Sequence, residues 1–288
     1  MTHSRADISR LLAEIGRRPR QSLGQNFVAD PNTVRRIVRL AELPPGSRVV
    51  EVGAGLGSLT LALAEAGHHV VAIEIDGDLV PVLRRLVEPH GVRVVQADVM
   101  RLDWDELLRS STEPPGTAAA SDASQPCHLV ANLPYNIATP VVCDVLDDVP
   151  AIATMLVMVQ REVAERLVAR VGDDAYGAPS VKVAFWANAR IVGHVPATVF
   201  VPQPKVESSL VRIVRRAEPV SDVDPTVLFD LVRAGFAQRR KMLRRALSGR
   251  VTAEQFAAAG VAPEARAEQL AVEDWARLAR VVAGEGAT

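Results

Sequence analysis

An amide, a proline-stiffened backbone and an aromatic ring come together in the run Asn132-Leu133-Pro134-Tyr135. The side-chain oxygen of Asn132 and the carbonyl of Leu133 can accept the two hydrogens of an exocyclic amino group, because Pro134 narrows the backbone conformations around that carbonyl. Tyr135 can stack on the face of a flat ring. Acceptors aimed at both hydrogens favour the pyramidal amine, whose lone pair is free to attack. The run therefore indicates group transfer to a ring amine. For the tetrapeptide alone, the alternative is a strand and a proline turn with a half-buried tyrosine.

A second candidate site is the glycine-rich loop Gly53-Ala54-Gly55-Leu56-Gly57, which lies between a predicted strand and a predicted helix. Such a loop lets a ligand approach the backbone at a helix N-terminus. Glu74 ends the next strand, 21 residues after Gly53, where an acid can hold both ribose hydroxyls of an adenosine; the alternative is a solvated carboxylate. Asp98 follows a third strand and can accept from an adenine amino group, although such an aspartate is more often a turn residue. The pattern predicts an adenosine-containing cofactor and does not separate NAD from S-adenosylmethionine.

The elements that must position these residues alternate between strand and helix. Strands are predicted at 48–52, 69–75, 92–97, 127–131, 155–159, 190–195 and 207–214. Helices are predicted at 7–17, 31–43, 58–66, 78–87, 161–171 and 181–189, and another opens at Thr139-Pro140. The alternation predicts an α/β doubly wound, mostly parallel sheet, with a final antiparallel hairpin. Asn132 then lies at the carboxyl edge of the sheet, where ligands bind in such folds.

The pattern changes after residue 218. The polar, proline-bearing stretch 219–225 predicts a domain boundary, so we expect one domain at 1–218 and a second at 219–288. The second is purely helical, with helices predicted at 225–237, 239–248, 252–259 and 272–283. Residues 110–126 are rich in Ser, Thr, Pro, Gly and Ala and predict a surface loop.

Composition excludes several classes of protein. Hydrophobic residues make up 48% of the 288 residues, which is ample for a core, and no apolar run reaches transmembrane length. Cys127 and Cys143 offer neither a disulfide framework nor enough ligands for a metal site. We therefore expect a cytoplasmic protein that uses no membrane and no metal.

Positive charge is concentrated in one segment, although the net charge of the chain is −1. Residues 228–250 hold seven basic side chains and one acidic one, a net of +6, whereas residues 251–288 have a net of −3. Such a segment on a helix predicts a broad basic surface that contacts RNA phosphates; the alternative is a solvated helix without a partner. The predicted RNA-binding residues are Arg239, Arg240, Lys241, Arg244 and Arg245.

These blocks together resemble one family over nearly the whole chain. The blocks are Gly24-Gln25-Asn26-Phe27, Glu51-Val52-Gly53-Ala54-Gly55-Leu56-Gly57, Glu74, Asp98, Asn132-Leu133-Pro134-Tyr135-Asn136-Ile137-Ala138-Thr139-Pro140, Phe200-Val201-Pro202-Gln203-Pro204-Lys205-Val206 and Phe236-Ala237-Gln238-Arg239-Arg240-Lys241. The chain is similar to the rRNA adenine N6,N6-dimethyltransferases of the KsgA (RsmA) family, which are class I, S-adenosylmethionine-dependent enzymes. The last block resembles the small-subunit enzymes rather than the large-subunit methylases that confer macrolide resistance.

The resemblance implies a Rossmann-like methyltransferase sheet of seven strands and a small helical C-terminal domain. It implies dimethylation of two adjacent adenosines in a hairpin loop near the 3′ end of 16S rRNA, on a small-subunit precursor, by a monomer that also serves late ribosome biogenesis. The residues placed at the cofactor are Asn26, Val28, Gly53, Gly55, Gly57, Glu74, Asp98 and Asn132. Val28 departs from the leucine that the family often has, and residues 110–126 resemble an insertion. Phe200 is predicted to cover the target adenine opposite Tyr135, with a place in the core as the alternative.

Four other functions remain open. An NAD dehydrogenase shares the glycine loop and Glu74 but has no use for the run from Asn132 to Tyr135, and cofactor binding distinguishes it. A DNA adenine methyltransferase shares the chemistry and is distinguished by a substrate assay. The large-subunit methylases differ in the RNA they modify. A non-catalytic assembly factor needs the basic surface and none of the site residues.

Overall fold

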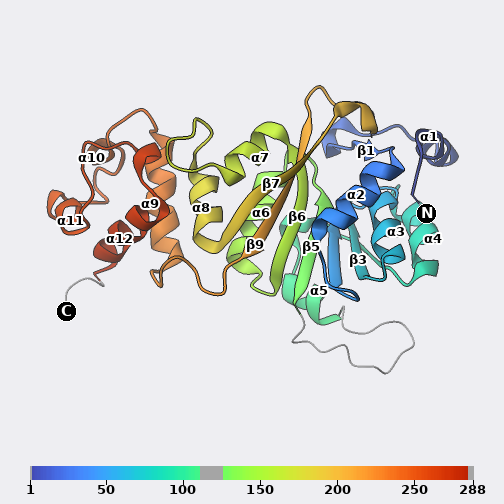
Figure 1. Ribbon diagram of the computed structural model, residues 1–288, viewed down its shortest axis with the longest axis horizontal. Coiled ribbons are helices and arrows are strands. Elements are labelled where there is room, and N and C mark those ends of the chain that lie inside the picture. The colour runs from blue at the N-terminus through green and yellow to red at the C-terminus, as the bar shows by residue number, and fades with distance from the viewer. Residues whose placement is uncertain (1, 111–125, 285–288) are drawn as a thin grey trace. The chain divides into compact units, whose positions relative to one another are not determined.

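The computed structural model describes residues 2–110 and 126–284, and the chain divides into two compact units (Figure 1). Unit 1 is Met1–Ala164 with Arg190–Val214, and unit 2 is Glu165–Ala189 with Arg215–Thr288. The predicted domain border after residue 218 stays a prediction. The two units differ from it in the segment Glu165–Ala189, which joins the C-terminal part because its helix packs against two C-terminal helices. Residues 111–125 of the predicted surface loop lie outside the described residues.

A seven-stranded sheet forms the framework of unit 1. Its strands are β2 (Arg48–Val52), β3 (His69–Glu74), β4 (Arg93–Gln96), β5 (Cys127–Asn132), β6 (Ile152–Gln160), β7 (Ala187–Val195) and β9 (Ser208–Arg215). Their order is β4-β3-β2-β5-β6-β9-β7, with parallel pairing from β4 to β6 and antiparallel pairing of β9 with β6. The predicted mostly parallel sheet with a late antiparallel strand is confirmed.

The register of the sheet brings the predicted site residues to one edge. Val52 is paired with Ile73 in the parallel pair β2–β3, so the glycine loop and Glu74 leave the sheet at the same level. Asn132 is the last residue of β5, which is the other neighbour of β2. Parallel strands carry their carboxyl ends to a common edge, and the chemistry therefore gathers there.

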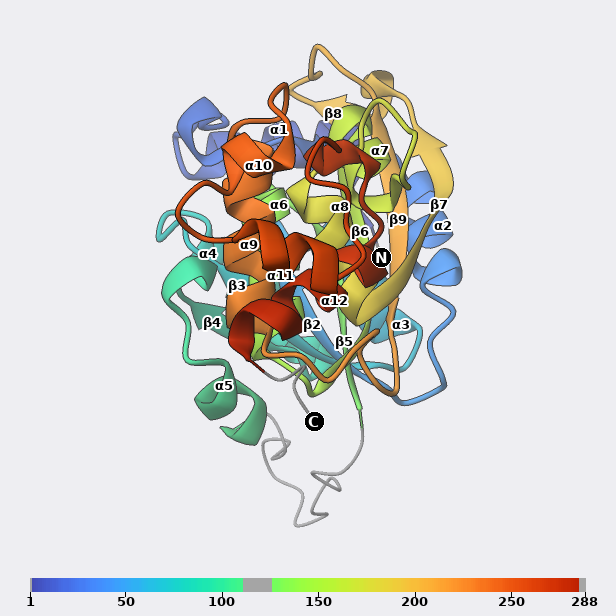
Figure 2. The same cartoon turned by 90° about the vertical axis from the view of Figure 1, so that its left-hand side faces the viewer.

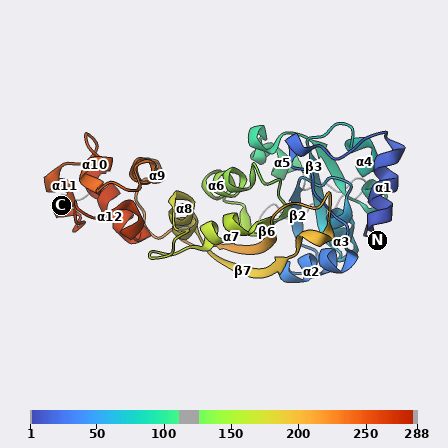
Figure 3. The same cartoon turned by 90° about the horizontal axis from the view of Figure 1, so that it is seen from above.

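Helices cover both faces of this sheet. They are α2 (Pro31–Ala41), α3 (Ser58–Glu65), α4 (Val80–Val87), α5 (Trp104–Ser110), α6 (Ala138–Asp148) and α7 (Arg161–Val168). Helices α2, α3 and α4 share one core cluster with Leu156 and Met158 of β6. The alternate residues Val157 and Val159 are equally buried, and α6 packs on β6 from the side opposite to α2 (Figure 3). A strand buried on both faces explains the continuous apolar sequence of β6.

An N-terminal segment precedes the sheet and packs against the glycine loop. Its helix α1 (Arg5–Glu14) begins with a capping box between Ser4 and Asp7, and it buries Ile8 and Leu11 against Leu56. Further along, β1 (Phe27–Val28) pairs antiparallel with β8 (Phe200–Val201). The sequence did not predict this small ribbon, because two-residue strands carry no periodicity.

Unit 2 is helical, and α9 (Pro225–Ala237) and α12 (Val272–Ala283) lie side by side in it (Figure 2). The unit also contains α8 (Ala178–Trp186), α10 (Leu243–Ala246) and α11 (Ala253–Ala258). Trp275 is fully buried at its centre, where its ring lies so close to Gly235 that a Cβ there would meet it at 2.6 Å. Glycine at this position thus permits the close approach of α9 and α12.

The prediction of one helix over 239–248 is wrong. Residues 238–241 form a turn and a bend, Met242 pairs with Arg266 in an isolated bridge, and only Leu243–Ala246 is helical. The amide of Leu243 donates to the carbonyl of Ala265, and that of Arg244 donates to Pro263. These bonds to another segment replace the bonds that a longer helix would make. The predicted helix at 181–189 also ends earlier, at Trp186, where β7 begins.

Candidate active site

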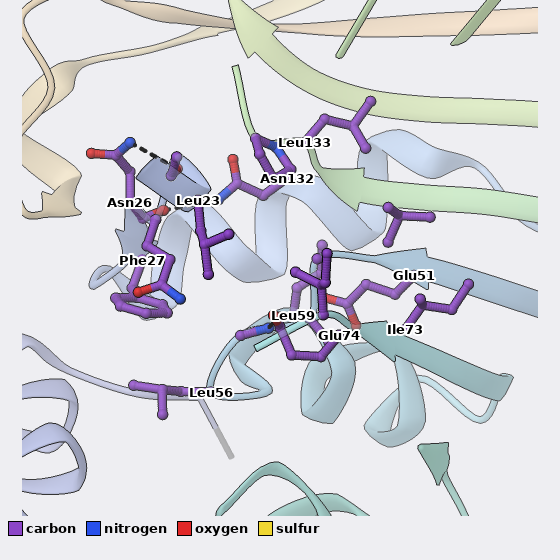
Figure 4. Close-up of a pocket in the computed structure, with 18 of the residues that line it drawn as sticks. Leu23, Asn26, Phe27, Glu51, Leu56, Leu59, Ile73, Glu74, Asn132 and Leu133 are labelled. Carbon is purple, nitrogen blue, oxygen red and sulfur yellow. Dashed lines mark hydrogen bonds between the residues drawn. The ribbon is translucent and has the colours of Figure 1, made fainter. Parts of the chain in front are cut away.

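A cavity lies at the carboxyl edge of the sheet, and the predicted residues that line it come from five segments far apart in the chain. The lining residues that the sequence predicts are Asn26, Val28, Gly53, Gly55, Glu74, Asp98, Asn132, Leu133, Pro134 and Tyr135. Figure 4 shows Asn26 and Asn132 close together in this cavity, with Glu51 and Glu74 deeper along β2 and β3. Gly57 and Phe200 do not line it.

Glycine is required at two positions of the loop for different physical reasons. Gly55 has φ 59°, and a Cβ there would lie 2.9 Å from Cε1 of Phe27, so the aromatic ring rests directly on the loop. Gly57 precedes α3 with φ 82°, and a Cβ there would meet Val87 and Leu83 at 2.8 and 2.9 Å. Gly55 therefore shapes the cavity, while Gly57 serves the packing of α3 against α4.

Glu74 is held by the backbone of the loops around it. One carboxylate oxygen accepts from the amide of Gly55 at 2.7 Å, and the other accepts from the amide of Asp76 at 2.8 Å. Burial raises the pKa of Glu74, and the two backbone hydrogen bonds oppose that rise. Each carboxylate oxygen can accept more than one hydrogen bond, so Glu74 retains capacity for a pair of hydroxyls.

Glu51 is a further candidate site residue, which in the sequence stands out only as part of one block of the family resemblance. It is 2% exposed, lines the cavity, and its Oε2 has no hydrogen-bond partner among the described residues. Burial, with a smaller contribution from the nearby charge of Glu74, raises the pKa of Glu51 to about 8. An acid between Val50 and Val52 in a fully buried strand was the signal that marks it.

The side chain of Asn132 is oriented by the N-terminal segment. Its Nδ2 donates to the backbone carbonyl of Asn26 at 3.0 Å. Only the nitrogen of an amide can donate, so this bond turns the side-chain oxygen away from Asn26. Asn26 in turn donates from its own Nδ2 to the carbonyl of Gly24 at 3.1 Å. The acceptor predicted for Asn132 is thus available and fixed in direction.

A polar clasp, made of Arg20, Gln25 and Asp76, holds that segment against the end of β3. Arg20 Nη1 lies 3.0 Å from Asp76 Oδ1, and Gln25 Nε2 donates to Asp76 Oδ2 at 2.7 Å. Gln25 Oε1 accepts from the amide of Arg20 at 2.8 Å. The side chain of Asp76 is only 4% exposed, which strengthens the pairing. Nothing in the sequence linked these positions, which lie more than 50 residues apart.

The two aromatic residues predicted at the target base have different surroundings. Tyr135 is partly buried and lines the cavity, and burial raises the pKa of its hydroxyl. Phe200 is fully buried in the core cluster of unit 1. This placement favours the core alternative for Phe200, and its predicted contact with an adenine stays a prediction.

The predicted RNA-binding residues lie in unit 2, on the turn and short helix that replace the predicted long helix. Arg239 pairs with Glu268 at 2.5 Å and Arg244 pairs with Glu264 at 3.2 Å. The three others of this group are exposed and form no ion pair with any described residue. They are Arg240, Lys241 and Arg245. The concentration of positive charge is therefore smaller than the sequence count of +6 indicates.

Neither a membrane-spanning helix nor a metal cluster is found in the described parts of the chain. No helix in residues 2–110 and 126–284 has the length and apolar character needed to cross a membrane. In the same ranges, no group of three or more His, Cys, Asp and Glu side chains is arranged to hold a metal ion.

Known proteins resemble the chain over most of its length. The matching family model is described as ribosomal RNA adenine dimethylase and covers residues 16–283. The small subunit methyltransferase A of Thermobifida fusca is 49% identical over 95% of this chain and 94% of its own, and that of Cutibacterium acnes is 47% identical over 98% and 95%. The crystal structure of the 23S rRNA methyltransferase ErmE superposes with a TM-score of 0.63 at 28% identity, over 89% of this chain and 99% of its own. A dimethyladenosine transferase from Plasmodium falciparum shares the fold, with a TM-score of 0.66 at 21% identity over 86% of this chain and 94% of its own. With the cavity, the sheet and these relatives in agreement, the chain belongs to the ribosomal RNA adenine dimethylase family.

Proposed function

We propose that this protein transfers methyl groups from S-adenosylmethionine to N6 of two adjacent adenosines in a hairpin loop near the 3′ end of 16S rRNA, giving N6,N6-dimethyladenosines. The observation that carries the proposal is the amide of Asn132. Its nitrogen is committed to the carbonyl of Asn26, so its oxygen is left as an oriented acceptor in the cavity. The names of the Thermobifida and Cutibacterium relatives, which refer to the small ribosomal subunit, support the choice of RNA.

The polar groups of the cavity fit S-adenosylmethionine, which when bound supplies an electrophilic methyl group on a sulfonium. The unpartnered Oε2 of Glu51 suits the ammonium of the methionine part, because a buried acceptor gains most from a cation. Gly53 and Gly55 allow the backbone to approach that part closely. Glu74 would hold the ribose hydroxyls, and Asp98 the adenine amino group. Asn26 and Val28 complete the proposed lining.

The chain's own residues would act on the target amine by positioning it. Asn132 Oδ1 and the carbonyl of Leu133 accept the two hydrogens on N6, so the lone pair turns out of the ring system. Tyr135 stacks on the adenine, a contact worth about 1–3 kcal/mol per base. A base in a hairpin loop leaves its stack more readily than one in a duplex. The amine proton becomes acidic only after the nitrogen has attacked, so no strong base is needed and positioning supplies the rate.

We further propose that the protein acts as a cytoplasmic monomer on a small-subunit precursor, where it also serves late assembly. The basic residues of unit 2 would contact rRNA phosphates, which position a substrate without reading its bases. The basic residues that would contact rRNA belong to unit 2, whereas the residues that would act on the amine belong to unit 1. A variant that cannot methylate should therefore still bind the subunit.

The test is incubation of the protein with radiolabelled S-adenosylmethionine and small subunits that lack the modification, followed by mapping of the labelled nucleotides. Label on two adjacent adenosines of the 3′ hairpin loop is the expected result. Large subunits serve as the matched substrate control. Label on 23S rRNA alone would favour the activity named for ErmE, the second candidate, whose fold this chain shares at 28% identity.

Replacement of Asn132 by alanine separates chemistry from binding. The variant should lose transfer, because the amine loses an acceptor that shapes it in the transition state, while its thermal unfolding and its binding to small subunits stay close to those of the parent. Near-normal turnover in Asn132→Ala would remove the role proposed for this side chain.

A further inference from the structure

The hydroxyl of Tyr135 is bound to a buried serine on a strand far away in the chain. Tyr135 Oη and Ser208 Oγ lie 2.9 Å apart, and Ser208 is 0% exposed. Ser208 begins β9 and is paired with Gln160 at the end of β6, while Asn132 at the end of β5 is paired with Met158 of β6. The tyrosine therefore reaches from the turn after β5 across the end of β6 to the edge of β9.

This bond fixes the tyrosine ring at its far end. Its near end is fixed by the turn in which the amide of Ile137 donates to the carbonyl of Pro134 at 3.1 Å. The hydroxyl lies on the axis about which a tyrosine ring flips, so the bond permits ring flips and opposes swings about χ1. Among the described residues, neither hydroxyl of the pair has a second hydrogen-bond partner. The two groups thus depend on each other.

We propose that Ser208 is a positioning residue that holds the ring of Tyr135 in the plane on which the target adenine stacks. The inference rests on the proposed function, because it takes Tyr135 as the stacking surface. It also means that Tyr135 recognises the base by the face of its ring, since the hydroxyl is already engaged. Loss of the anchor lets the ring swing, and a misplaced ring lowers turnover without weakening the binding of the cofactor.

Ser209 supplies a matched control on the same strand. It is also 0% exposed, and its Oγ lies 3.0 Å from Nδ1 of His194, so Ser209→Ala removes a buried, hydrogen-bonded hydroxyl as Ser208→Ala does. Neighbouring residues of a strand face opposite sides of the sheet, so Ser209 does not point toward Tyr135. A purely structural role predicts that both variants lower the unfolding temperature and leave turnover unchanged.

The first measurement is a double-mutant cycle on methylation of small subunits. We expect Ser208→Ala and Tyr135→Phe each to lower kcat by about tenfold, and the double variant to lose no more than either one, because both remove the same bond. The Kd for S-adenosylmethionine should stay as in the parent, and Ser209→Ala should keep the parent kcat. Additive losses in the double variant, or equal kcat in Ser208→Ala and Ser209→Ala, would overturn the proposal.

The second measurement reports on the ring directly, because the chain has only two tyrosines, Tyr135 and Tyr176. Protein labelled with 3-fluorotyrosine gives two fluorine resonances, which Tyr176→Phe assigns. In Ser208→Ala the Tyr135 resonance should shift and change in width while that of Tyr176 stays, and Ser209→Ala should leave the Tyr135 resonance unchanged. An unaltered Tyr135 resonance in Ser208→Ala contradicts the anchor.

A parent protein that does not methylate small subunits contradicts the proposed function itself, whereas an active parent with an unaffected Ser208→Ala variant contradicts only this inference.

Discussion

Glu51 and Glu74 are two buried carboxylates in one cavity, and their surroundings give them different hydrogen bonding and different protonation. Glu74 has both oxygens in hydrogen bonds to backbone amides, which favour its charged form. Glu51 has an oxygen without a partner among the described residues, and burial raises its pKa to about 8. The free protein therefore holds Glu51 protonated at neutral pH, and a bound cation would favour its ionisation.

The raised pKa of Glu51 has a consequence for stability. The unfolded chain releases the proton near pH 4.5 and the folded chain only near pH 8. Between these values the folded state binds more protons, so stability falls as the pH rises, by at most about 1.4 kcal/mol per pH unit. Glu51→Gln removes this loss. Its unfolding temperature should exceed that of the parent by a margin that grows from pH 5 to pH 8. Glu88→Gln, on an exposed side chain, is the control and should show no such trend.

Glu74→Ala should weaken the binding of S-adenosylmethionine, because the ribose hydroxyls lose a charged acceptor worth about 1.5–3 kcal/mol. The variant also frees the amide of Gly55 from its bond, which loosens the glycine loop. Calorimetric titration of the variant and of Glu88→Ala measures the effect. Equal affinities for the two, or a preference of the parent for NAD, would contradict the assignment of Glu74.

At this scale, residue types at strand ends were predictable and long-range partners were not. Asn132 and Glu74 end strands, and the glycines follow one. Their residue types at these positions indicate their chemistry from the sequence alone. Glu51 was named only within a block, because the sequence does not reveal that one of its oxygens lacks a partner among the described residues. Ser208 was missed because its partner lies 73 residues away and a serine at the start of a strand has no distinctive signal.

At the scale of elements, the contact between the ring of Phe27 and the glycine loop joins β1 to the cavity at the carboxyl edge of the sheet. Gly55→Ala would place a methyl group 2.9 Å from that ring. Gly67→Ala is a matched control, because Gly67 also has positive φ, at 82°, and has nothing within 4 Å of its added Cβ. Both variants bear a left-handed strain of about 1–2 kcal/mol. Only Gly55→Ala should also weaken S-adenosylmethionine binding, as measured by calorimetry. Equal affinity in the two variants would show that the Phe27 ring moves aside without disturbing the binding of S-adenosylmethionine.

The elements themselves were predicted where periodicity is strong. The strands β2 and β3 and the helix α9 begin and end within one residue of the expected positions, since each has an unbroken pattern and a clear breaker at its ends. The helix α5 and the ribbon of β1 with β8 were absent from the prediction because they are short. The helix expected at 239–248 does not form, because the amides of Leu243 and Arg244 donate hydrogen bonds to a distant segment instead of to the preceding turn. Local helix propensity carries no information about such tertiary hydrogen bonds.

At the scale of the whole molecule, the basic side chains that form no ion pair are more available to RNA phosphates than those that already pair with a carboxylate. Arg240→Ala, Lys241→Ala and Arg245→Ala together should weaken binding to small subunits and flatten its salt dependence, by about 0.7–0.9 in slope for each phosphate that is no longer neutralised. A triple replacement of the exposed Arg35, Arg39 and Arg84 in unit 1 removes the same charge. Filter binding over a range of salt concentrations compares the two. Equal losses would mean that only net charge matters; S-adenosylmethionine binding should stay constant in the first variant.

The N-terminal segment has contacts with residues that are synthesised much later in the chain. Asn26 meets Asn132 across 106 residues, β1 needs its partner at Phe200–Val201, and Arg5 donates to the carbonyl of Thr198 across 193 residues. A nascent polypeptide that ends before residue 198 therefore lacks the partners of the Arg5 guanidinium and the partner strand of β1. Such a chain already contains the clasp of Arg20 and Gln25 with Asp76, while β1 still lacks its partner strand. Arrested translation products of increasing length should acquire full cofactor affinity only once residue 201 has cleared the exit tunnel, because β1 pairs with β8 only then.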